Sequence, residues 1–224
     1  DRSAPSFQNV TVADSVAVVA ADGEGFFVVD VSDSTNLVVI ANVQPMVNAV
    51  YDDLEVKEVI LHGGLLYVAT DQAGPLVYDM ADPAHPVLIG YDSILDSGLP
   101  APYGEFFDGD LAAEENRLYL CHWDIHEPGT LIFDIAGPEP LYVGRTEAND
   151  FTRFAAIDGS MVYGCSGESG LFGLELVAGQ LERRGKLLLP AVWGAEAHGS
   201  LVYVASTDYG LVISDWADPT DPQV

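Results

Sequence analysis

The stretch GLVISDWADPTDP at residues 210–222 decides the fold, because shorter forms of it recur along the chain. In each copy a glycine precedes a mostly apolar run, and an acidic residue stands five positions after the glycine. The last two intervals between these glycines are 41 and 40 residues, the length of a four-stranded propeller blade. The copies are GFFVVD from Gly25, GPLVYD from Gly74, GTLIFD from Gly129, GLFGLE from Gly170 and GLVISD from Gly210.

The sequence therefore predicts an all-β fold, a β-propeller of about five four-stranded blades in one domain that spans residues 1–224. The repeats cover approximately residues 8–43, 56–91, 109–145, 153–189 and 193–224. The last copy stops where its fourth strand should begin, and an open strand edge needs a cover. The N-terminal segment 2–7 is one candidate to close the ring. The alternatives are a larger propeller and completion of the edge by another chain.

Several repeated residues are predicted to have structural roles. The glycine adopts positive φ without a steric penalty, and the acidic residue that ends the third strand accepts hydrogen bonds from later backbone N–H groups. Cys121 and Cys165 stand where other copies have alanine, so they are expected to be small buried core residues. His62, His85 and His198 fall in turns, where we expect exposed structural side chains.

The repeated phrase resembles the LVIVD repeat, whose consensus runs close to G-L-V-I-V-D-V-S-D-P-x-x-P. Residues 210–222 are its nearest match, and the resemblance covers nearly the whole chain. The resemblance implies a β-propeller of bacterial or archaeal secreted and surface proteins, usually without assigned chemistry. It supports the fold more strongly than it supports any function.

The charge is strongly negative, with 35 Asp and Glu against 8 Lys and Arg and a formal net charge of -27. Such a chain repels nucleic acid and anionic lipid headgroups, and it suits a salt-rich medium that screens self-repulsion. No apolar run is long enough to span a membrane, so we expect no membrane insertion. The expected location is the secreted or cell-surface space, extracellular or periplasmic, with a halophilic source as one setting.

Three segments are longer than the bare repeat requires, and all three fall on one face of the predicted propeller: residues 44–55, 92–108 and 122–128. Long loops on a rigid scaffold are common binding sites. Their aromatic and acidic residues predict a surface for a carbohydrate, a cationic ligand or a protein partner, with packing of the aromatics against each other as an equal alternative. The candidate binding residues are Tyr51, Asp53, Tyr103, Phe106, Phe107 and Trp123.

Two smaller constellations carry further hypotheses. His122, Asp124 and His126 share one side of an extended segment and are candidate ligands for a divalent cation, although a solvated polar loop is the favoured interpretation. Around the predicted channel mouth, four charged residues are candidates for binding a small polar ligand or ion, and charge pairs that hold adjacent blades together are the more ordinary explanation. These residues are Lys57, Glu58, Asp110 and Arg153.

No catalytic motif is present, so the chain is predicted not to be an enzyme. The leading hypothesis is an extracellular binding or scaffolding propeller that assembles with proteins or surfaces, itself included, through its loop-bearing face or open blade edge. One alternative is a metal-dependent or carboxylate-based hydrolase with its site at the channel mouth. The other is a structural spacer domain of a longer surface protein.

Overall fold

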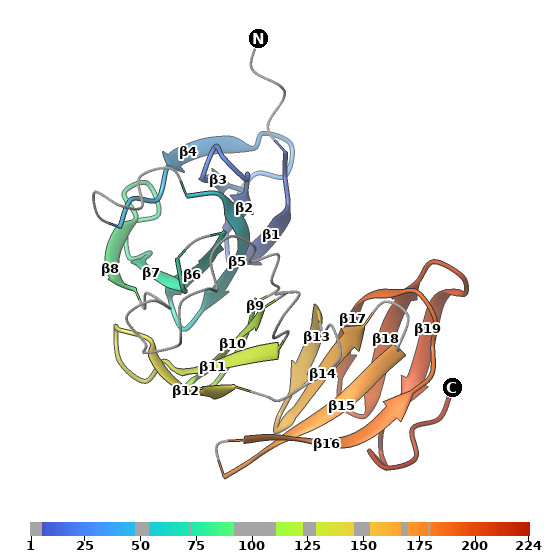
Figure 1. The fold of residues 1–224 in the computed structure, drawn as a ribbon. Coiled ribbons are helices and arrows are strands. Elements are labelled where there is room, and N and C mark those ends of the chain that lie inside the picture. The colour runs from blue at the N-terminus through green and yellow to red at the C-terminus, as the bar shows by residue number, and fades with distance from the viewer. Residues whose placement is uncertain are drawn as a thin grey trace. The chain divides into compact units, whose positions relative to one another are not determined.

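The computed structural model describes residues 6–47, 54–71, 73–91, 111–122, 129–145, 153–166, 170–178 and 180–224. The described residues form strands and turns without a helix, in five antiparallel sheets whose strands follow chain order (Figure 1). These sheets are the five blades of a β-propeller fold, as the repeat predicts.

The strand bounds follow the repeat closely. Sheet 1 contains β1 (Asn9–Ala13), β2 (Val16–Ala20), β3 (Phe26–Asp30) and β4 (Val38–Val43), and sheet 2 contains β5 (Val56–His62), β6 (Leu65–Thr70), β7 (Leu76–Asp79) and β8 (Val87–Tyr91). Sheet 3 contains β9 (Leu111–Glu114), β10 (Arg117–His122), β11 (Gly129–Asp134) and β12 (Leu141–Arg145). Sheet 4 contains β13 (Arg153–Asp158), β14 (Met161–Ser166), β15 (Gly170–Val177) and β16 (Gln180–Leu187), and sheet 5 contains β17 (Val192–His198), β18 (Leu201–Ser206) and β19 (Gly210–Asp215).

The chain forms two compact units, which we describe separately. The first unit comprises Asp1–Leu111 and Asp134–Tyr142, and it contains sheets 1 and 2. The second unit comprises Ala112–Phe133 and Val143–Val224, and it contains sheets 4 and 5. Strands of sheet 3 contribute to both units.

The repeated glycine has the predicted backbone conformation in three copies. Gly25, Gly170 and Gly210 have φ of 77°, 100° and 72°. Close backbone contacts also require glycine, since a Cβ on Gly25 would lie 2.1 Å from the Val43 carbonyl oxygen and one on Gly170 would lie 2.2 Å from that of Leu187. Both constraints act at the entry to the third strand, which explains why the glycine recurs there.

The repeated acidic residue forms the predicted turn in four copies. The carboxylates of Asp30, Asp79, Asp134 and Asp215 each accept a hydrogen bond from the backbone N–H two residues later, at 2.8–2.9 Å. This is the local Asx-turn geometry that favours aspartate at the end of a strand. Glu175 of the fourth copy instead forms an ion pair with Arg184, with 2.6 Å between Nε and Oε2.

The described sheet-to-sheet seams follow one packing rule. In the second strand of each sheet, one residue stands at an equivalent position of the repeat: Val18, Tyr67, Tyr119, Tyr163 and Tyr203. We call the face of the sheet that carries this residue the leading face, and the opposite face the receiving face. In the first unit, Phe26 on the leading face of sheet 1 contacts Tyr78 on the receiving face of sheet 2, with ring centroids 5.1 Å apart. A common buried cluster surrounds this pair.

The second unit repeats this arrangement twice. Tyr163 on the leading face of sheet 4 contacts Trp216, which lies among the buried residues of sheet 5, with ring centroids 5.3 Å apart. Tyr119 and Cys121 of sheet 3 pack with Val162 on the receiving face of sheet 4. The expected burial of Cys121 is confirmed, at 1% exposure, whereas the side chain of Cys165 lies outside the described residues.

Sheet 5 differs from the other four sheets because its described residues form only three strands. Beyond β19, an isolated bridge joins Asp215 and Gln223, whose backbone groups exchange hydrogen bonds of 2.8 and 3.0 Å. This bridge has the register of the first pair between the third and fourth strands of sheet 1, Asp30 with Val38. Residues 211–214 of β19 have no described partner strand on their outer side.

The N-terminal segment is described from residue 6 onward, so its predicted ring-closing role stays a prediction. The Gln8 backbone N–H donates to the Ala20 carbonyl at 3.0 Å, which extends the β1–β2 ladder by one residue. Phe7 contacts Phe27 of sheet 1 in an edge-to-face arrangement with ring centroids 6.3 Å apart. This described part therefore packs on the receiving face of sheet 1.

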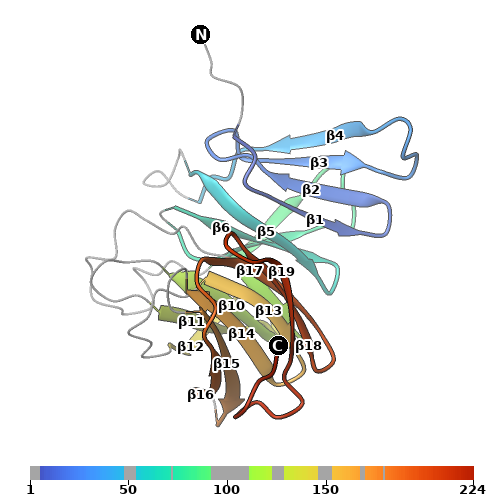
Figure 2. The ribbon, with the colours of Figure 1, turned by 90° about the vertical axis from the view of Figure 1, so that its right-hand side faces the viewer.

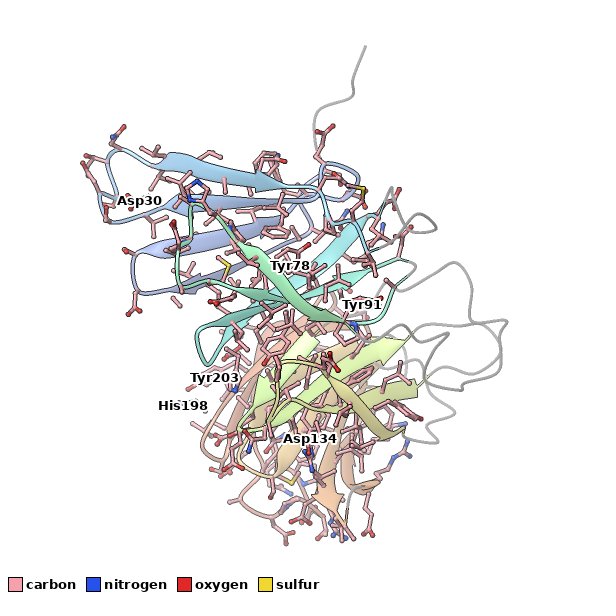
Figure 3. All side chains as sticks on the ribbon, turned by 90° about the vertical axis from the view of Figure 1, so that its left-hand side faces the viewer. Asp30, Tyr78, Tyr91, Asp134, His198 and Tyr203 are labelled. Atoms are coloured by element: carbon pink, nitrogen blue, oxygen red, sulfur yellow. The ribbon has the colours of Figure 1, made fainter. Side chains whose placement is uncertain are left out.

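Tyr78 predicts a loss of stability at alkaline pH. Burial raises the pKa of Tyr78, whose side chain is labelled in Figure 3, to about 12 from its ordinary value of 10.0. Because the folded state disfavours the tyrosinate, its contribution is complete below the ordinary pKa and is lost as pH rises through the raised pKa. The free energy of unfolding, measured by urea titration at about pH 8 and about pH 11, is expected to fall at the higher pH. The fall should be smaller in Tyr78→Phe, and an identical fall in both proteins would contradict this assignment.

Candidate functional site

The described charges that sequence analysis placed at the channel mouth lie on the seam between sheets 1 and 2. Lys57 Nζ donates to Asp22 Oδ1 and to Glu55 Oε2, both at 2.7 Å. Asp22 stands in the turn between β2 and β3, and its backbone pairs with Val56 at the start of β5 by hydrogen bonds of 3.2 and 3.0 Å. The seam is thus fixed by backbone pairing and by an ion-pair cluster beside it.

A β-bulge places Lys57 in this position. The register with β6 shifts between Val56 and Glu58, so Lys57 is the residue without an opposite partner in the ladder. A bulge re-aims a side chain relative to regular alternation along a strand. The spacing of residues in the sequence cannot reveal such a shift. Sequence analysis therefore placed Lys57 and Glu58 in the same candidate site.

The electrostatics of the cluster keep Lys57 cationic. Partial burial of the ammonium group opposes its charged form, but the hydrogen bonds and charges of Asp22 and Glu55 outweigh burial and raise the pKa of Lys57 above its ordinary value. The Lys57 side chain is 18% exposed. A lysine held in this way is a poor general base, so the cluster favours the predicted role of charge pairs that hold adjacent blades together.

Polar residues of β1 complete the seam, and sequence analysis did not assign them this role. Asn9 Oδ1 accepts from the Val59 backbone N–H at 3.1 Å, and Asn9 Nδ2 donates to Glu58 Oε1. Thr11 Oγ1 accepts from the Leu61 backbone N–H at 3.2 Å. The sequence signal for this role is the pair Asn9 and Thr11, two polar residues in a strand that is otherwise apolar. Figure 2 shows β1 beside β5, the strand whose backbone groups it satisfies.

The ion-pair cluster gives a quantitative prediction. In a double-mutant cycle of Lys57→Met and Asp22→Asn, the coupling free energy should be about 0.5–1 kcal/mol, since the pair is partly exposed. Asparagine tolerates the left-handed backbone at position 22, where φ is 50°. The measurement is urea unfolding at low and high salt, and the coupling should shrink as salt screens the charges. A coupling of zero at low salt would contradict the role assigned to Lys57.

A groove of about 310 Å³ lies at the opposite end of the strands of sheets 1 and 2, between the turn that joins β1 to β2 and the turn that joins β5 to β6. Sequence analysis expected His62 to be exposed. The structure instead places a half-buried His62 in the groove wall. His85 and His198 are exposed, as expected. The groove is lined by Ala13, Asp14, Ser15, Val16, Leu61, His62, Gly63, Gly64, Met80 and Pro83.

Most of the other predicted site residues lie outside the described residues. They are Tyr51, Asp53, Tyr103, Phe106, Phe107, Asp110, Trp123, Asp124 and His126. The structure describes the backbone of His122 at the end of β10 and of Arg153 at the start of β13, but not their side chains. The loop-bearing binding face and the cation site therefore stay predictions.

Two searches of the described residues bear on function. No group of three or more His, Cys, Asp or Glu side chains within the described ranges could hold a metal ion. Among those same ranges, no helix is long and apolar enough to cross a membrane.

Comparison with solved structures supports the fold. The chain superposes on the computationally designed Ika8 protein with a TM-score of 0.66 at 10% identity, covering 95% of this chain and 59% of that one. It superposes on a chain of the Nidogen/Laminin complex with a TM-score of 0.63 at 14% identity, covering 98% and 80%. For BamB from Moraxella catarrhalis the TM-score is 0.60 at 9% identity, covering 97% and 58%. The chain thus spans about three fifths of the length of Ika8 and BamB.

Comparison with protein sequences supports the repeat family. No curated protein matches the sequence. The family model described as the LVIVD repeat matches residues 6–44, 55–92 and 192–224. These matches cover the first, second and fifth copies of the phrase that opened the sequence analysis. The chain carries the LVIVD repeat three times, which confirms the resemblance of the repeated phrase to that repeat.

Proposed function

We propose that this chain is an exported scaffolding β-propeller that binds proteins through the open edge of its fifth sheet, with its loop-bearing face as a second contact surface. The carrying observation is the outer side of β19, where residues 211–214 have no described partner strand while sheets 1–4 each have four strands. Exposed backbone N–H and C=O groups at such an edge are a template for an added strand.

Side chains beside this edge favour a protein partner. Tyr209 and Leu211 are exposed at the turn into β19 and at its start. Aromatic and aliphatic side chains next to unpaired backbone groups provide both parts of strand addition, hydrogen bonds and side-chain pockets. The net charge of -27 favours a neutral or basic partner and export into a medium that screens self-repulsion.

The similar structures agree with a protein partner in general terms. One similar chain, with a TM-score of 0.66 at 11% identity over 92% of this chain and 60% of that one, belongs to a structure of the Mitotic Checkpoint Complex. Another belongs to the Nidogen/Laminin complex. Those two chains function in protein complexes, and the proposal extends this type of role to the present propeller.

The test uses a strand that the protein already contains. A synthetic peptide with the sequence of residues 36–44, which includes β4, should bind the intact chain and slow hydrogen exchange of the outward amides in residues 211–214. The control peptide carries proline in place of Ala41, which pairs with Val28 in the β3–β4 ladder, because proline has no N–H group to donate. Equal protection by both peptides, or none by either, would refute the open edge as the binding site.

A further inference from the structure

A row of side-chain hydrogen bonds crosses the seam between sheets 1 and 2, where β1 lies beside β5 (Figure 2). Asn9 Oδ1 accepts from the Val59 N–H at 3.1 Å, and Thr11 Oγ1 accepts from the Leu61 N–H at 3.2 Å. A strand directs alternate backbone N–H groups to its two sides, so these donors point away from β6 and toward sheet 1. Side chains of β1 thus satisfy, one after another, the donors that the β5–β6 ladder does not use.

The next donor in this row is the N–H group of Gly63, which directly follows β5. The next residue of β1 in the row is Ala13, whose side chain has no acceptor atom. Among the residues that the structure describes, none accepts a hydrogen bond from the Gly63 N–H. Because a backbone N–H group is a strong donor with a fixed direction, Gly63 offers it to an acceptor from outside the chain.

The seam between sheets 3 and 4 shows which acceptor suits this position. Gly159 follows β13 as Gly63 follows β5, and both glycines have φ of 60°. The Gly159 N–H donates to Glu114 Oε1 at 3.0 Å. Glu114 ends β9 as Ala13 ends β1. A carboxylate oxygen therefore occupies, in the second unit, the position for which Ala13 supplies no acceptor in the first.

Gly63 borders the groove of about 310 Å³, whose lining residues all belong to the first unit. The apolar part of the lining includes Leu61 and Met80 of sheet 2 and Val16 of sheet 1. Asp14 adds a negative charge from the turn between β1 and β2. A ligand that matches this groove has an acceptor oxygen for Gly63, a cationic group for Asp14 and an apolar portion.

We propose that the groove binds a small zwitterion, an α-amino acid with an apolar side chain. One oxygen of its carboxylate accepts from the Gly63 N–H, its ammonium group donates to Asp14, and its side chain packs on the apolar lining. The ammonium group is needed because Asp14 and the net charge of -27 repel a purely anionic ligand. The inference goes beyond the proposed function, because the groove lies in the first unit and β19 in the second.

The test is a titration of the intact chain with leucine, followed by the amide signal of Gly63 in proton–nitrogen NMR spectra. Leucine should shift this signal until the site is saturated. Isopentylamine lacks the carboxylate of leucine and isocaproate lacks its ammonium group, so each should bind about tenfold more weakly or less tightly still. Equal affinity for the three compounds, or no saturable shift with leucine, would overturn the inference.

Ala13→Glu gives the first unit the arrangement of Glu114 and Gly159. Its carboxylate should accept from the Gly63 N–H, slow the exchange of that amide without any ligand, and weaken leucine binding by about tenfold or more. His198→Glu is the matched control, because His198 is exposed and ends β17 as Ala13 ends β1, and the substitution adds the same charge. This control should bind leucine as the original chain does.

Asp14→Asn separates the two polar contacts of the ligand. Asparagine tolerates the left-handed backbone at this position, where φ is 51°, and removes the charge. Leucine affinity should fall by about tenfold while isocaproate affinity rises, since the like charge is gone. The inference is wrong if Asp14→Asn keeps the original preference for leucine over isocaproate, or if Ala13→Glu binds leucine undiminished. Peptide binding at β19 would in either case still support the proposed function.

Discussion

Trp216→Ala is expected to lower the free energy of unfolding by about 3–5 kcal/mol, the largest stability effect that we predict for a single side chain. Trp216 is 2% exposed and packs edge-to-face on Tyr163, so truncation leaves a cavity in the core between sheets 4 and 5. Its Nε1–H also donates to Ser214 Oγ at 2.9 Å, and Ser214 Oγ donates to the Val202 carbonyl at 3.2 Å. Packing and hydrogen bonding are therefore lost together.

Trp216→Phe separates these two contributions. Phenylalanine keeps most of the apolar packing but lacks the indole donor, so the expected loss is smaller, about 1–2 kcal/mol. Urea unfolding monitored by far-UV circular dichroism measures both variants at a dilute protein concentration. A loss below about 1 kcal/mol for Trp216→Ala would contradict the assigned packing between sheets 4 and 5.

Gly185→Val should destabilise the second unit by about 3 kcal/mol, because the site has no room for a side chain. A Cβ at position 185 in β16 would lie 1.9 Å from the Pro219 carbonyl oxygen, in the turn that follows β19. A backbone atom cannot move aside as a flexible side chain can. Gly90 in β8 has the same relation to the Pro138 carbonyl, at 2.3 Å, so the turn of the next sheet packs on a glycine in both units.

Gly194→Ala is the matched control for this prediction. Gly194 also lies in a strand, and a Cβ there would have no atom within 4 Å. Its expected change in the free energy of unfolding is within about 0.5 kcal/mol. If Gly185→Val and Gly194→Ala were equally stable, the close approach of the Pro219 turn to β16 would be wrong.

Local chemistry explains what the sequence could predict about the fold. The glycine before the third strand and the aspartate at its end form contacts only with residues close to them in the sequence. Gly25 and Asp30 therefore adopt the conformations that the repeat predicts. The strand bounds follow from these turns. Glu175 departs from the pattern because a longer side chain pairs with Arg184 in the adjacent strand, which no local rule contains.

The candidate site was less predictable because its contacts join different sheets. Alignment of the repeats placed Lys57 and Glu58 in one candidate site, but the bulge at Lys57 gives the two side chains different partners. Lys57 binds Asp22 and Glu55, and Glu58 accepts a hydrogen bond from Asn9. The spacing of Gly185 gives no sign of Pro219, since their approach depends on how two sheets pack.

The most direct test of the central claim, that the protein binds its partners through the outer edge of β19, is amide hydrogen exchange measured with and without the peptide of residues 36–44. In dilute solution, the outward amides of residues 211–214 should exchange much faster than those of residues 26–29, the equivalent positions of β3, which are paired with β4. With the peptide of residues 36–44 bound, residues 211–214 should become protected. Slow exchange of residues 211–214 in the dilute monomer, equal to that of residues 26–29, would contradict the account.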